Sequence, residues 1–300
     1  MASLTVRIFI HNFSLQLTAT LRSQSVGMLD TPKEESLTYT NCPKLSVVVV
    51  AYNESHMLND CLRCVEWADE IVVVDLGSSD DTVEIAKRFG AKVYEHPHVN
   101  WVELVRNFSF ELATGDWILM LDPDERVPPK LAEVIRALIR GSPQFTAVRI
   151  PFCHSIFGKI IDRSGWGHHA LTRLFRRGHV TWRPEVHSQP EVSGAVLTLP
   201  YSGSEMAIFH LNYSSVSQWV EKMNRYTTAE AQRLRARHRS FHPLKLFYQP
   251  AKEFWNRYFI AQGFRDGLHG LILSLLMAFY YLVTYVKLWE LERNESASPK

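Results

Sequence analysis

Two aspartates one residue apart, Asp122 and Asp124, directly follow the apolar run Trp117–Leu121. Carboxylates at this spacing can converge on one divalent cation, and Mg²⁺ and Mn²⁺ favour oxygen ligands that are often shared with substrate phosphates. The same residues could instead form a turn whose aspartate caps the next helix. The first interpretation predicts metal-assisted chemistry on a phosphorylated substrate.

Two further apolar runs end in polar residues. Residues 46–51 lead into Tyr52, Asn53 and Glu54, and residues 71–74 lead into Asp75. Ligands bind beyond the carboxyl ends of parallel strands, so these side chains are expected at one edge of a sheet. Such a gathering of carboxylates calls for a cation or hydrogen-bond donors to neutralise it. The metal interpretation is therefore preferred over the simple turn.

The elements that position these residues alternate between strands and helices. Strands are predicted at 46–51, 71–74, 92–94 and 117–121, and helices at 55–68, 82–89, 101–113 and from 128 onwards. This alternation predicts an α/β fold with βαβ units and a parallel sheet. Later strands are expected at 146–152, 171–176 and 195–211. A capping box at Ser215 and Gln218 opens a helix over 216–238.

Charge divides the chain unevenly. The formal net charge of the 300 residues is +2, but residues 45–150 carry a net charge of −7 and residues 151–300 carry +8. An acidic half suits a cation, and a basic half suits phosphate, nucleic acid or a membrane surface. We expect a poorly ordered N-terminal extension over 1–44 and a catalytic domain over 45–215, divided at 145/146 into a nucleotide-sugar half and an acceptor half. A helical region over 216–290 and a tail over 291–300 are expected to follow.

Several classes of protein are excluded or disfavoured. The chain has neither a G-x-G-x-x-G motif after its first strand nor a P-loop, and no secretory signal is apparent at residues 1–44. Four cysteines suggest a reduced, cytosolic-side protein. Cys61 and Cys64 lie on one predicted helix with no second ligand pair nearby, which favours core packing over zinc binding. No nucleic-acid motif accompanies the basic residues.

Several segments, in order, resemble family-two glycosyltransferases with the GT-A fold. They are residues 46–54, 68–82, 106–107, 113–117 and 121–126. The branch of lipopolysaccharide-core glucosyltransferases also carries segments similar to residues 171–178, 186–187, 224–228 and 285–289. The resemblance covers roughly residues 45–290. It implies an inverting transfer of a sugar, glucose or another hexose, from a UDP-linked donor to a lipopolysaccharide-core or other lipid-linked glycan.

The resemblance also implies roles for individual residues. Tyr52, Asn53, Glu54 and Asp75 would line the nucleoside pocket. Asp122 and Asp124 would hold Mg²⁺ or Mn²⁺ on the diphosphate, and His210 would add a metal ligand unless it is a structural histidine. Arg106 would bind the diphosphate, or it is an exposed helix arginine.

An inverting displacement needs a general base near the acceptor hydroxyl. Glu185, Glu191 and Asp162 are the candidates, with Glu185 preferred because it precedes His187 by two residues. The branch usually has an acidic residue directly after this histidine, where Ser188 stands here.

The C-terminal half suggests a membrane partner. Residues 222–257 hold nine Lys or Arg residues and two Glu residues, interleaved with aromatic residues, and residues 268–286 carry no charge. An apolar stripe that includes Leu275, Phe279 and Val286 favours a helix lying in the membrane interface, with core packing and membrane crossing as alternatives. The expected location is the cytoplasmic face of the inner or plasma membrane, with peripheral or monotopic attachment.

Two other functions remain open from the sequence. A non-catalytic module that binds nucleotide sugars or membranes is supported by Ser188 and opposed by the intact Asp122 and Asp124. A nucleotidyltransferase would need a basic glycine-rich loop after the first strand, which residues 51–54 lack.

Overall fold

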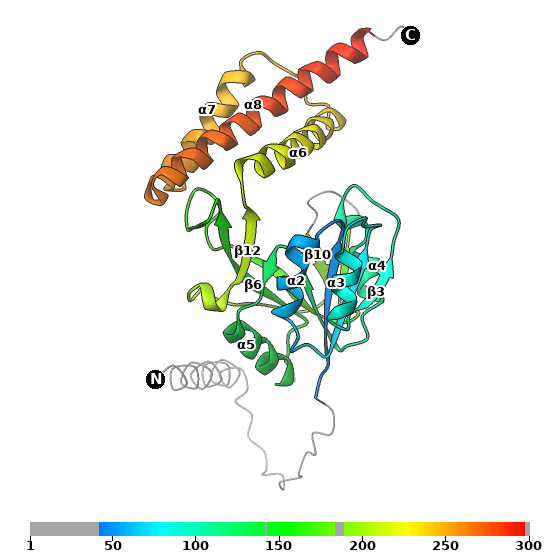
Figure 1. The fold of residues 1–300 in the computed structure, drawn as a ribbon. Helices are drawn as coiled ribbons and strands as arrows, with labels where there is room; N and C mark the ends of the chain where they lie inside the picture. The colour runs from blue at the N-terminus through cyan, green and yellow to red at the C-terminus, as the bar shows by residue number, and fades with distance from the viewer. Residues whose placement is uncertain (1–41, 142, 184–188, 298–300) are drawn as a thin grey trace, which may run out of the picture. The chain divides into compact units, whose positions relative to one another are not determined.

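The computed structural model describes residues 42–141, 143–183 and 189–297. Residues 42–300 group as one compact unit. Its centre is a mixed, mostly parallel sheet with helices on both faces (Figure 1). The expectation for residues 1–44 falls almost entirely outside the described residues.

The acidic half forms the parallel part of the sheet. β1 pairs in parallel with both β2 and β4, and β3 extends the sheet beyond β2. The strands are β1 (Leu45–Ala51), β2 (Glu70–Asp75), β3 (Lys92–Glu95) and β4 (Trp117–Leu121). All of β1 and β4 is buried, as expected for apolar runs covered on both faces. The four strand predictions are confirmed.

Alternate residues of β1 contribute to two hydrophobic clusters. Val47 and Val49 pack with residues of α2, α3 and α5, whereas Val48 and Val50 pack with residues around α4. The helices are α2 (Ser55–Arg63), α3 (Thr82–Arg88), α4 (Arg106–Glu111) and α5 (Pro129–Arg140). Side chains alternate between the two faces of a strand, so this one run fixes layers on both sides of the sheet.

The second half adds mostly antiparallel pairing. β8 joins β4 to β6 with antiparallel pairing on both sides, and β12 then pairs in parallel with β6. The strands are β5 (Glu125–Arg126), β6 (Ala147–Ile156), β7 (Lys159–Ile161), β8 (Ala170–Arg176), β9 (Val180–Trp182), β10 (Pro190–Val192), β11 (Val196–Thr198) and β12 (Ile208–Tyr213). β9 and β10 form a separate two-stranded sheet.

Three predicted elements differ from the structure. The first helix ends at Arg63, before residue 68. The helix expected over 101–113 is a 3₁₀ turn at Val102–Leu104 followed by the short α4. The strand expected over 195–211 is β11, a 3₁₀ turn (η2, Ser204–Met206) and β12, because Pro200 and Gly203 interrupt it. Apolar content alone could not locate these breaks.

The C-terminal region is helical. It comprises α6 (Val216–Ala236), α7 (Lys245–Trp255), the π-helical η3 (Asn256–Ile260), the 3₁₀ turn η4 (Gly263–Asp266) and α8 (Leu268–Ala297). The predicted capping box is confirmed, since Ser215 Oγ accepts a hydrogen bond from Gln218 N at 3.1 Å. α8 continues to Ala297, so most of the expected tail over 291–300 is helical. Residues 268–295 are long and apolar enough to cross a membrane by length and composition.

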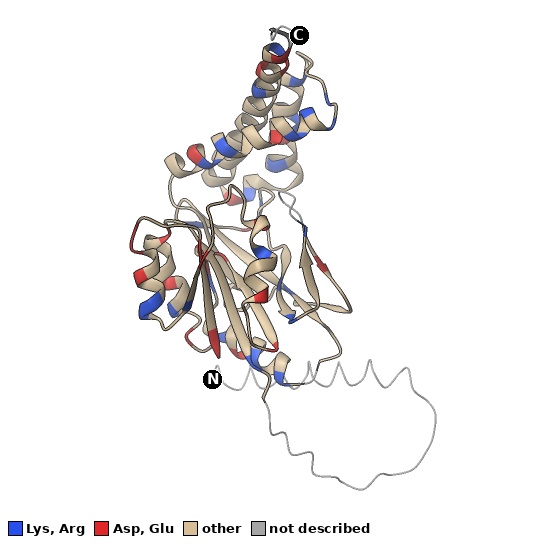
Figure 2. Ribbon diagram, turned by 90° about the vertical axis from the view of Figure 1, so that its right-hand side faces the viewer, with Lys and Arg blue, Asp and Glu red and all other residues tan. Residues whose placement is uncertain are grey.

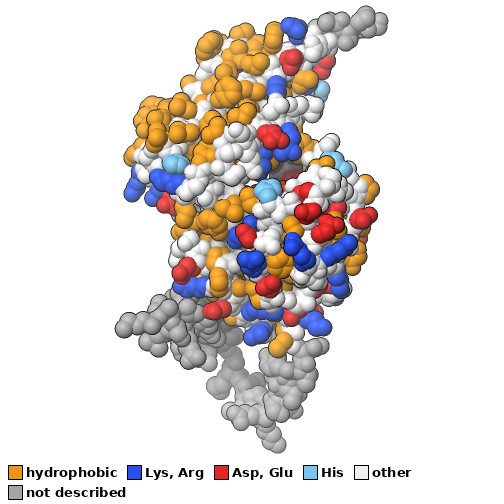
Figure 3. Space-filling view, viewed as in Figure 1, with side chains coloured by type: hydrophobic (Ala, Val, Ile, Leu, Met, Phe, Trp, Pro, Cys, Tyr) orange, Lys and Arg blue, Asp and Glu red, His pale blue; other side chains and the backbone are white. Residues whose placement is uncertain are grey.

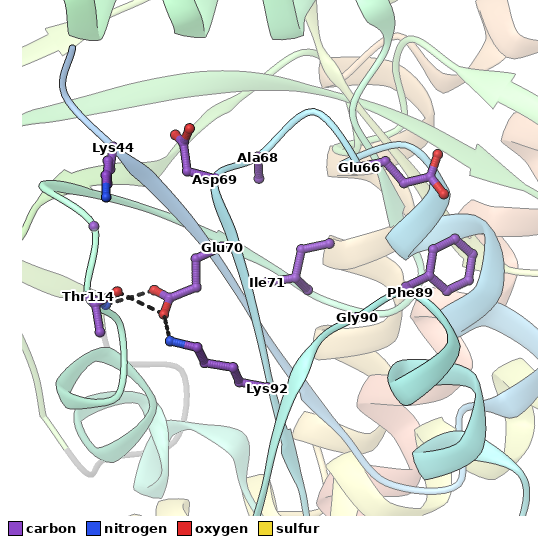
Figure 4. A pocket seen from close by; sticks show the side chains of 11 residues that line it. Lys44, Glu66, Ala68, Asp69, Glu70, Ile71, Phe89, Gly90, Lys92 and Thr114 are labelled. Carbon is purple, nitrogen blue, oxygen red and sulfur yellow. Dashed lines mark hydrogen bonds and ion pairs between the residues drawn. The ribbon is translucent and has the colours of Figure 1, made fainter. Parts of the chain in front are cut away.

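The amino edge of the parallel strands holds a hollow of about 410 Å³ (Figure 4). One of its carboxylates, Glu70, accepts hydrogen bonds from Thr114 and pairs with Lys92 at 2.7 Å. Burial alone would raise the pKa of Glu70, but these hydrogen bonds, first that of Lys92, lower it to about 2. Glu70 therefore ties strand ends together and is not available for chemistry.

Gly115 is required by the close approach of two chain segments at this edge. A Cβ at this position would lie 2.8 Å from Ser46 N and 2.9 Å from Lys44 O. We predict that Gly115→Ala lowers the free energy of unfolding by about 1–3 kcal/mol, because backbone atoms cannot move aside cheaply. Gly141→Ala is the control, since its nearest atoms lie 3.7 Å away. Urea unfolding measures both, and equal midpoints for the two variants would contradict this prediction.

Candidate active site

The carboxyl ends of β1, β2 and β4 open onto a cavity of about 870 Å³. Five predicted site residues line it together: Tyr52, Glu54, Asp122, Asp124 and His210. The opposite wall comes from α6, with Lys222, Arg225, Tyr226 and Thr228 among the lining residues. The strand ends thus converge as predicted. The helix α6, which belongs to the basic half of the chain, forms the opposite wall of the cavity.

Asp122 is held by two arginines. Its Oδ1 lies 2.5 Å from a guanidinium nitrogen of Arg106, and its Oδ2 lies 3.0 Å from one of Arg173. Arg173 also pairs with Glu125, which is fully buried and accepts a hydrogen bond from Asp122 N. Arg106 is only 3% exposed, which excludes the alternative of an exposed helix arginine. The two oxygens of Asp122 are therefore both occupied by guanidinium groups.

This cluster separates the pKa values of its two carboxyl groups. Burial alone would raise the pKa of Asp122, but the charges of Arg106 and Arg173 lower it well below its usual range. Burial raises the pKa of Glu125 to about 7, and the negative charge of Asp122 contributes in the same direction. Asp122 is therefore ionised and fixed in position.

Asp124 faces the cavity beside His210. Its Oδ2 lies 3.3 Å from His210 Nε2 and 3.9 Å from Lys222 Nζ. His210 is placed there because β12 pairs with β5, which sets it opposite Glu125. Burial alone would lower the pKa of His210, but the hydrogen bond to Asp124 raises it. A carboxylate and an imidazole thus share one wall of the cavity.

These residues fit a metal site only when a ligand completes it. Within residues 42–297, as far as the structure describes them, no three His, Cys, Asp or Glu side chains are grouped to hold a metal ion. Asp124 supplies a carboxylate, the ligand type suited to Mg²⁺ and Mn²⁺, and His210 supplies an imidazole, which also binds first-row divalent metals. The remaining ligands would come from substrate phosphates and water, which is usual for Mg²⁺ sites.

Negative charge accumulates on the β1 side of the cavity. Burial raises the pKa of Glu54 to about 7, and the nearby charge of Asp124 adds to this shift. An incoming cation would relieve this repulsion, because an opposite charge favours the ionised carboxylate.

Of the four residues predicted to bind the nucleoside, Tyr52 and Glu54 line the cavity, whereas Asn53 and Asp75 are not among its lining residues. Tyr52 is 43% exposed, and its ring centroid lies 4.3 Å from that of His98. Asn53 adopts a left-handed φ of 53°, and its Oδ1 accepts a hydrogen bond from Ser79 N at 2.8 Å. Asp75 is nearly buried, and its Oδ2 accepts hydrogen bonds from Gly77 N and Ser78 N. Its Oδ1 has no hydrogen-bond partner among the described residues and could accept one from a ligand.

Two of the three candidates for the base lie among the described residues, and both are away from the cavity. Asp162 follows β7 and pairs with His168, and Glu191 lies on β10 and pairs with Arg183. Neither lines the cavity. Glu185 lies outside the described residues.

Sequence reasoning missed several residues that build the site. Arg173 and Glu125 lie within segments used for the resemblance but were given no role, because an ion pair between distant strands leaves no local pattern. Lys222 was counted only among the basic residues, although it lies on the α6 wall. The core-packing prediction for Cys61 and Cys64 agrees with the structure, where Cys61 is buried in the hydrophobic core and Cys64 packs against it.

Comparison with known proteins identifies the architecture. The family model described as glycosyl transferase family 2 matches residues 46–192. These residues form a family 2 glycosyltransferase domain. A glycosyltransferase of Rickettsia conorii, named as uncharacterized, is 27% identical and aligns over 82% of this chain and 90% of its own length. The lipopolysaccharide core biosynthesis glycosyltransferase LpsC of Rhizobium meliloti is 24% identical over 82% of this chain and 92% of its own.

The likeness to solved structures is weaker. A mannosyltransferase from Pyrobaculum calidifontis, in complex with GDP-Man and Mn²⁺, is 16% identical with a TM-score of 0.46, covering 90% of this chain and 80% of that one. Glucosyl-3-phosphoglycerate synthase from Mycobacterium tuberculosis, solved with Mn²⁺ and UDP, is 22% identical with a TM-score of 0.33. That match covers 38% of this chain and 44% of the synthase. The expected GT-A type of fold agrees with the family assignment and the mixed sheet.

Arg173 is predicted to be essential for the stability of this glycosyltransferase domain. Arg173→Leu leaves Glu125 and Asp122 without their shared partner, and breaking a buried ion pair from one side costs about 3–5 kcal/mol. Arg173→Lys retains one charge and should cost less. Urea unfolding measures both variants, and a loss for Arg173→Leu no larger than for Arg173→Lys would contradict the prediction.

Proposed function

We propose that this chain transfers a sugar, glucose or another hexose, with inversion, from a UDP-linked donor to a lipopolysaccharide-core or other lipid-linked glycan. The observation that carries the proposal is the pair Asp124 and His210 on the cavity wall, next to an Asp122 fixed by two arginines. The family assignment supports sugar transfer, and the relative LpsC supports a lipopolysaccharide-type acceptor.

Different residues are proposed to bind different parts of the donor. Tyr52, Asn53, Glu54 and Asp75 hold the nucleoside. Asp124 and His210 hold Mg²⁺ or Mn²⁺, which when bound offsets the charge developing on the leaving diphosphate. Lys222 is close enough to Asp124 to add a second positive charge there.

Asp122 takes a different role from the one expected of a metal ligand. With both oxygens bound to arginines, it fixes the turn that presents Asp124. Arg106 would then affect the diphosphate indirectly, by holding Asp122 in position. Alternatively, it would bind the diphosphate through a guanidinium nitrogen that lacks a partner among the described residues.

Glu185 remains the proposed general base, taking the proton from the acceptor hydroxyl. Trp182, three residues earlier, is anchored to α4 by hydrogen bonds with Asn107 and lies 5.7 Å from the Arg106 guanidinium. Trp182 therefore lies beside one of the two arginines that hold Asp122.

We also propose that the chain works on the cytoplasmic face of the inner or plasma membrane, on an anionic lipid surface. The support is the apolar helix α8, the basic residues before it and the relative LpsC.

Donor binding tests the metal pair. Asp124→Ala and His210→Ala are predicted to weaken Mn²⁺-dependent UDP binding by at least about tenfold, because each removes a ligand. Asp60→Ala, an exposed carboxylate on α2, is the control. Isothermal titration calorimetry with and without EDTA measures the effect. UDP binding that is tight without metal, or unchanged in Asp124→Ala, would refute the assignment of Asp124 and His210 as metal ligands.

Transfer tests the base. Glu185→Gln is predicted to lower kcat by about 10²–10⁴ while leaving the Kd for the UDP-sugar unchanged, since a base acts only on the acceptor. Glu191→Gln and Asp162→Asn are compared, and both are expected to keep activity because neither lines the cavity. The assay follows UDP release with extracted lipopolysaccharide precursors. Donor binding without transfer to any such acceptor would instead favour a non-catalytic binding module.

A further inference from the structure

The outer surface of the C-terminal helices is apolar. Hydrophobic side chains gather over α7 and α8 (Figure 3). Phe247 is 77% exposed, Ile260 is 70% exposed and Leu268 is 68% exposed. The other large hydrophobic residues exposed in this region are Leu244, Tyr248, Trp255, Phe259, Phe264, Leu275, Phe279, Val286 and Trp289. A contiguous surface of this kind marks an interaction site in a soluble domain.

α8 turns its small and polar residues inward. Gly270, Ser274 and Thr284 are buried, together with Leu273 and Leu288. The exposed stripe is Leu268, Leu275, Phe279 and Val286, whose spacings of seven and four residues place them on one helix face. Of the stripe predicted from sequence, Leu275, Phe279 and Val286 are exposed, and its other members are half-buried.

α7 likewise has apolar residues on its exposed face. Leu244, Phe247, Tyr248 and Trp255 recur at helical spacing and are all exposed, and no residue of α7 is buried. The π-helical segment continues the surface, with the rings of Trp255 and Phe259 in contact at 4.4 Å between centroids. The two helices thus present a shared apolar face.

The N-terminal end of α8 is held against the sheet by hydrogen bonds and packing. Asp266, in the turn before α8, is buried and accepts hydrogen bonds from Arg163 N and Ser164 Oγ. Lys159 Nζ donates to Asp266 O at 2.7 Å, and Leu273 packs with Ile156 and Ile161. This end of α8 must therefore stay on the side of the membrane where the sheet lies.

The C-terminal half of α8 is held against α6 by hydrogen bonds and an ion pair. Lys287 Nζ contacts Asn224 O at 2.6 Å and the hydroxyls of Thr227 and Thr228 at 2.9 and 2.7 Å. Arg235 of α6 pairs with Glu295, and Phe241 N donates to Glu292. α6 also forms the cavity wall, so it too belongs to the water-exposed part of the protein.

Both ends of α8 are therefore held on the same side of any membrane. A crossing helix would place residues 268 and 287 on opposite sides, about 28 Å apart along the axis, and would break one set of these contacts. Building on the membrane location proposed above, on which this inference rests, we propose that α7, η3, η4 and α8 form an in-plane anchor. This anchor inserts into one leaflet through Trp255, Phe259, Ile260, Phe264 and Leu268.

Charge complementarity identifies the partner as an anionic bilayer surface. Lys159, Arg163 and Arg265 are exposed beside the apolar tip formed by Phe264 and Leu268, and Lys252 is exposed on the apolar face of α7. Lys and Arg residues also occur along α6 and α7 (Figure 2). Basic residues beside inserted aromatic residues are the pattern of an interfacial helix on anionic lipid.

Vesicle sedimentation tests the anchor. The full chain is predicted to bind vesicles of phosphatidylethanolamine and phosphatidylglycerol at 3:1 more tightly than vesicles of phosphatidylcholine. The double variant Phe264→Ser/Leu268→Ser should bind at least about tenfold more weakly to both vesicle types, because insertion scales with buried apolar area. Lys252→Glu/Arg265→Glu should weaken binding to the anionic vesicles only.

The matched controls are Val196→Ser, an exposed apolar residue on β11, and Arg88→Glu, an exposed arginine on α3. Both should bind vesicles as the unaltered chain does. Unchanged vesicle binding in Phe264→Ser/Leu268→Ser would overturn the proposal. Self-association through this surface with no vesicle binding would overturn it equally.

Cysteine labelling separates in-plane from crossing attachment. In a Cys42→Ser background, Glu290→Cys and Arg88→Cys are compared in sealed inside-out membrane vesicles. A membrane-impermeant maleimide should label both positions equally, whereas protection of position 290 alone would show that α8 crosses. These measurements need no sugar transfer, so their failure and a failure of the proposed activity are distinguishable.

Discussion

The site depends on one buried electrostatic cluster, in which Arg106 and Arg173 hold the two oxygens of Asp122 while Glu125 accepts from Arg173 and from the backbone of Asp122. Buried charges are tolerated only when they are paired and hydrogen-bonded. Arg106 comes from α4, Arg173 from β8 and Asp122 from the end of β4, so this cluster joins both halves of the sheet at the cavity. Asp124, two residues on, is left to face the ligand with His210.

The cavity and the apolar surface share α6. One side of this helix supplies Lys222, Arg225 and Thr228 to the cavity, and Lys287 of α8 contacts Asn224, Thr227 and Thr228. The part of the protein proposed to touch lipid is thus one helix away from the part proposed to bind the donor. This arrangement suits an enzyme whose donor is soluble and whose acceptor is embedded in a membrane.

The local patterns in the sequence predicted most of the framework. The β-branched runs of β1, β2 and β4 gave both the strands and the edge where Asp122 lies, because a buried strand leaves a continuous apolar signal. The capping box at Ser215 predicted the start of α6. The break at 102–106 was not predicted, since Val102, Leu104 and Val105 keep helical spacing across it.

The site was predicted less completely than the fold. Tyr52, Glu54, Asp124 and His210 converge as expected, but the ion pairs of Asp122 with Arg106 and Arg173 join residues 16 and 51 positions apart. Nothing in local periodicity encodes such pairing. The stripe on α8 was visible in the sequence, but whether it faces inward or outward depends on contacts of Gly270, Ser274 and Lys287 with distant segments.

Asp124 and His210 are proposed to hold a divalent metal together with the donor's diphosphate. Pulsed electron paramagnetic resonance of Mn²⁺ bound to the chain with UDP detects both kinds of ligand. We expect coupling to a histidine nitrogen, which is lost in His210→Ala, together with coupling to phosphorus. Bound Mn²⁺ that shows phosphorus coupling but no nitrogen coupling in the unaltered chain would contradict the assignment of His210 and of the site built around it.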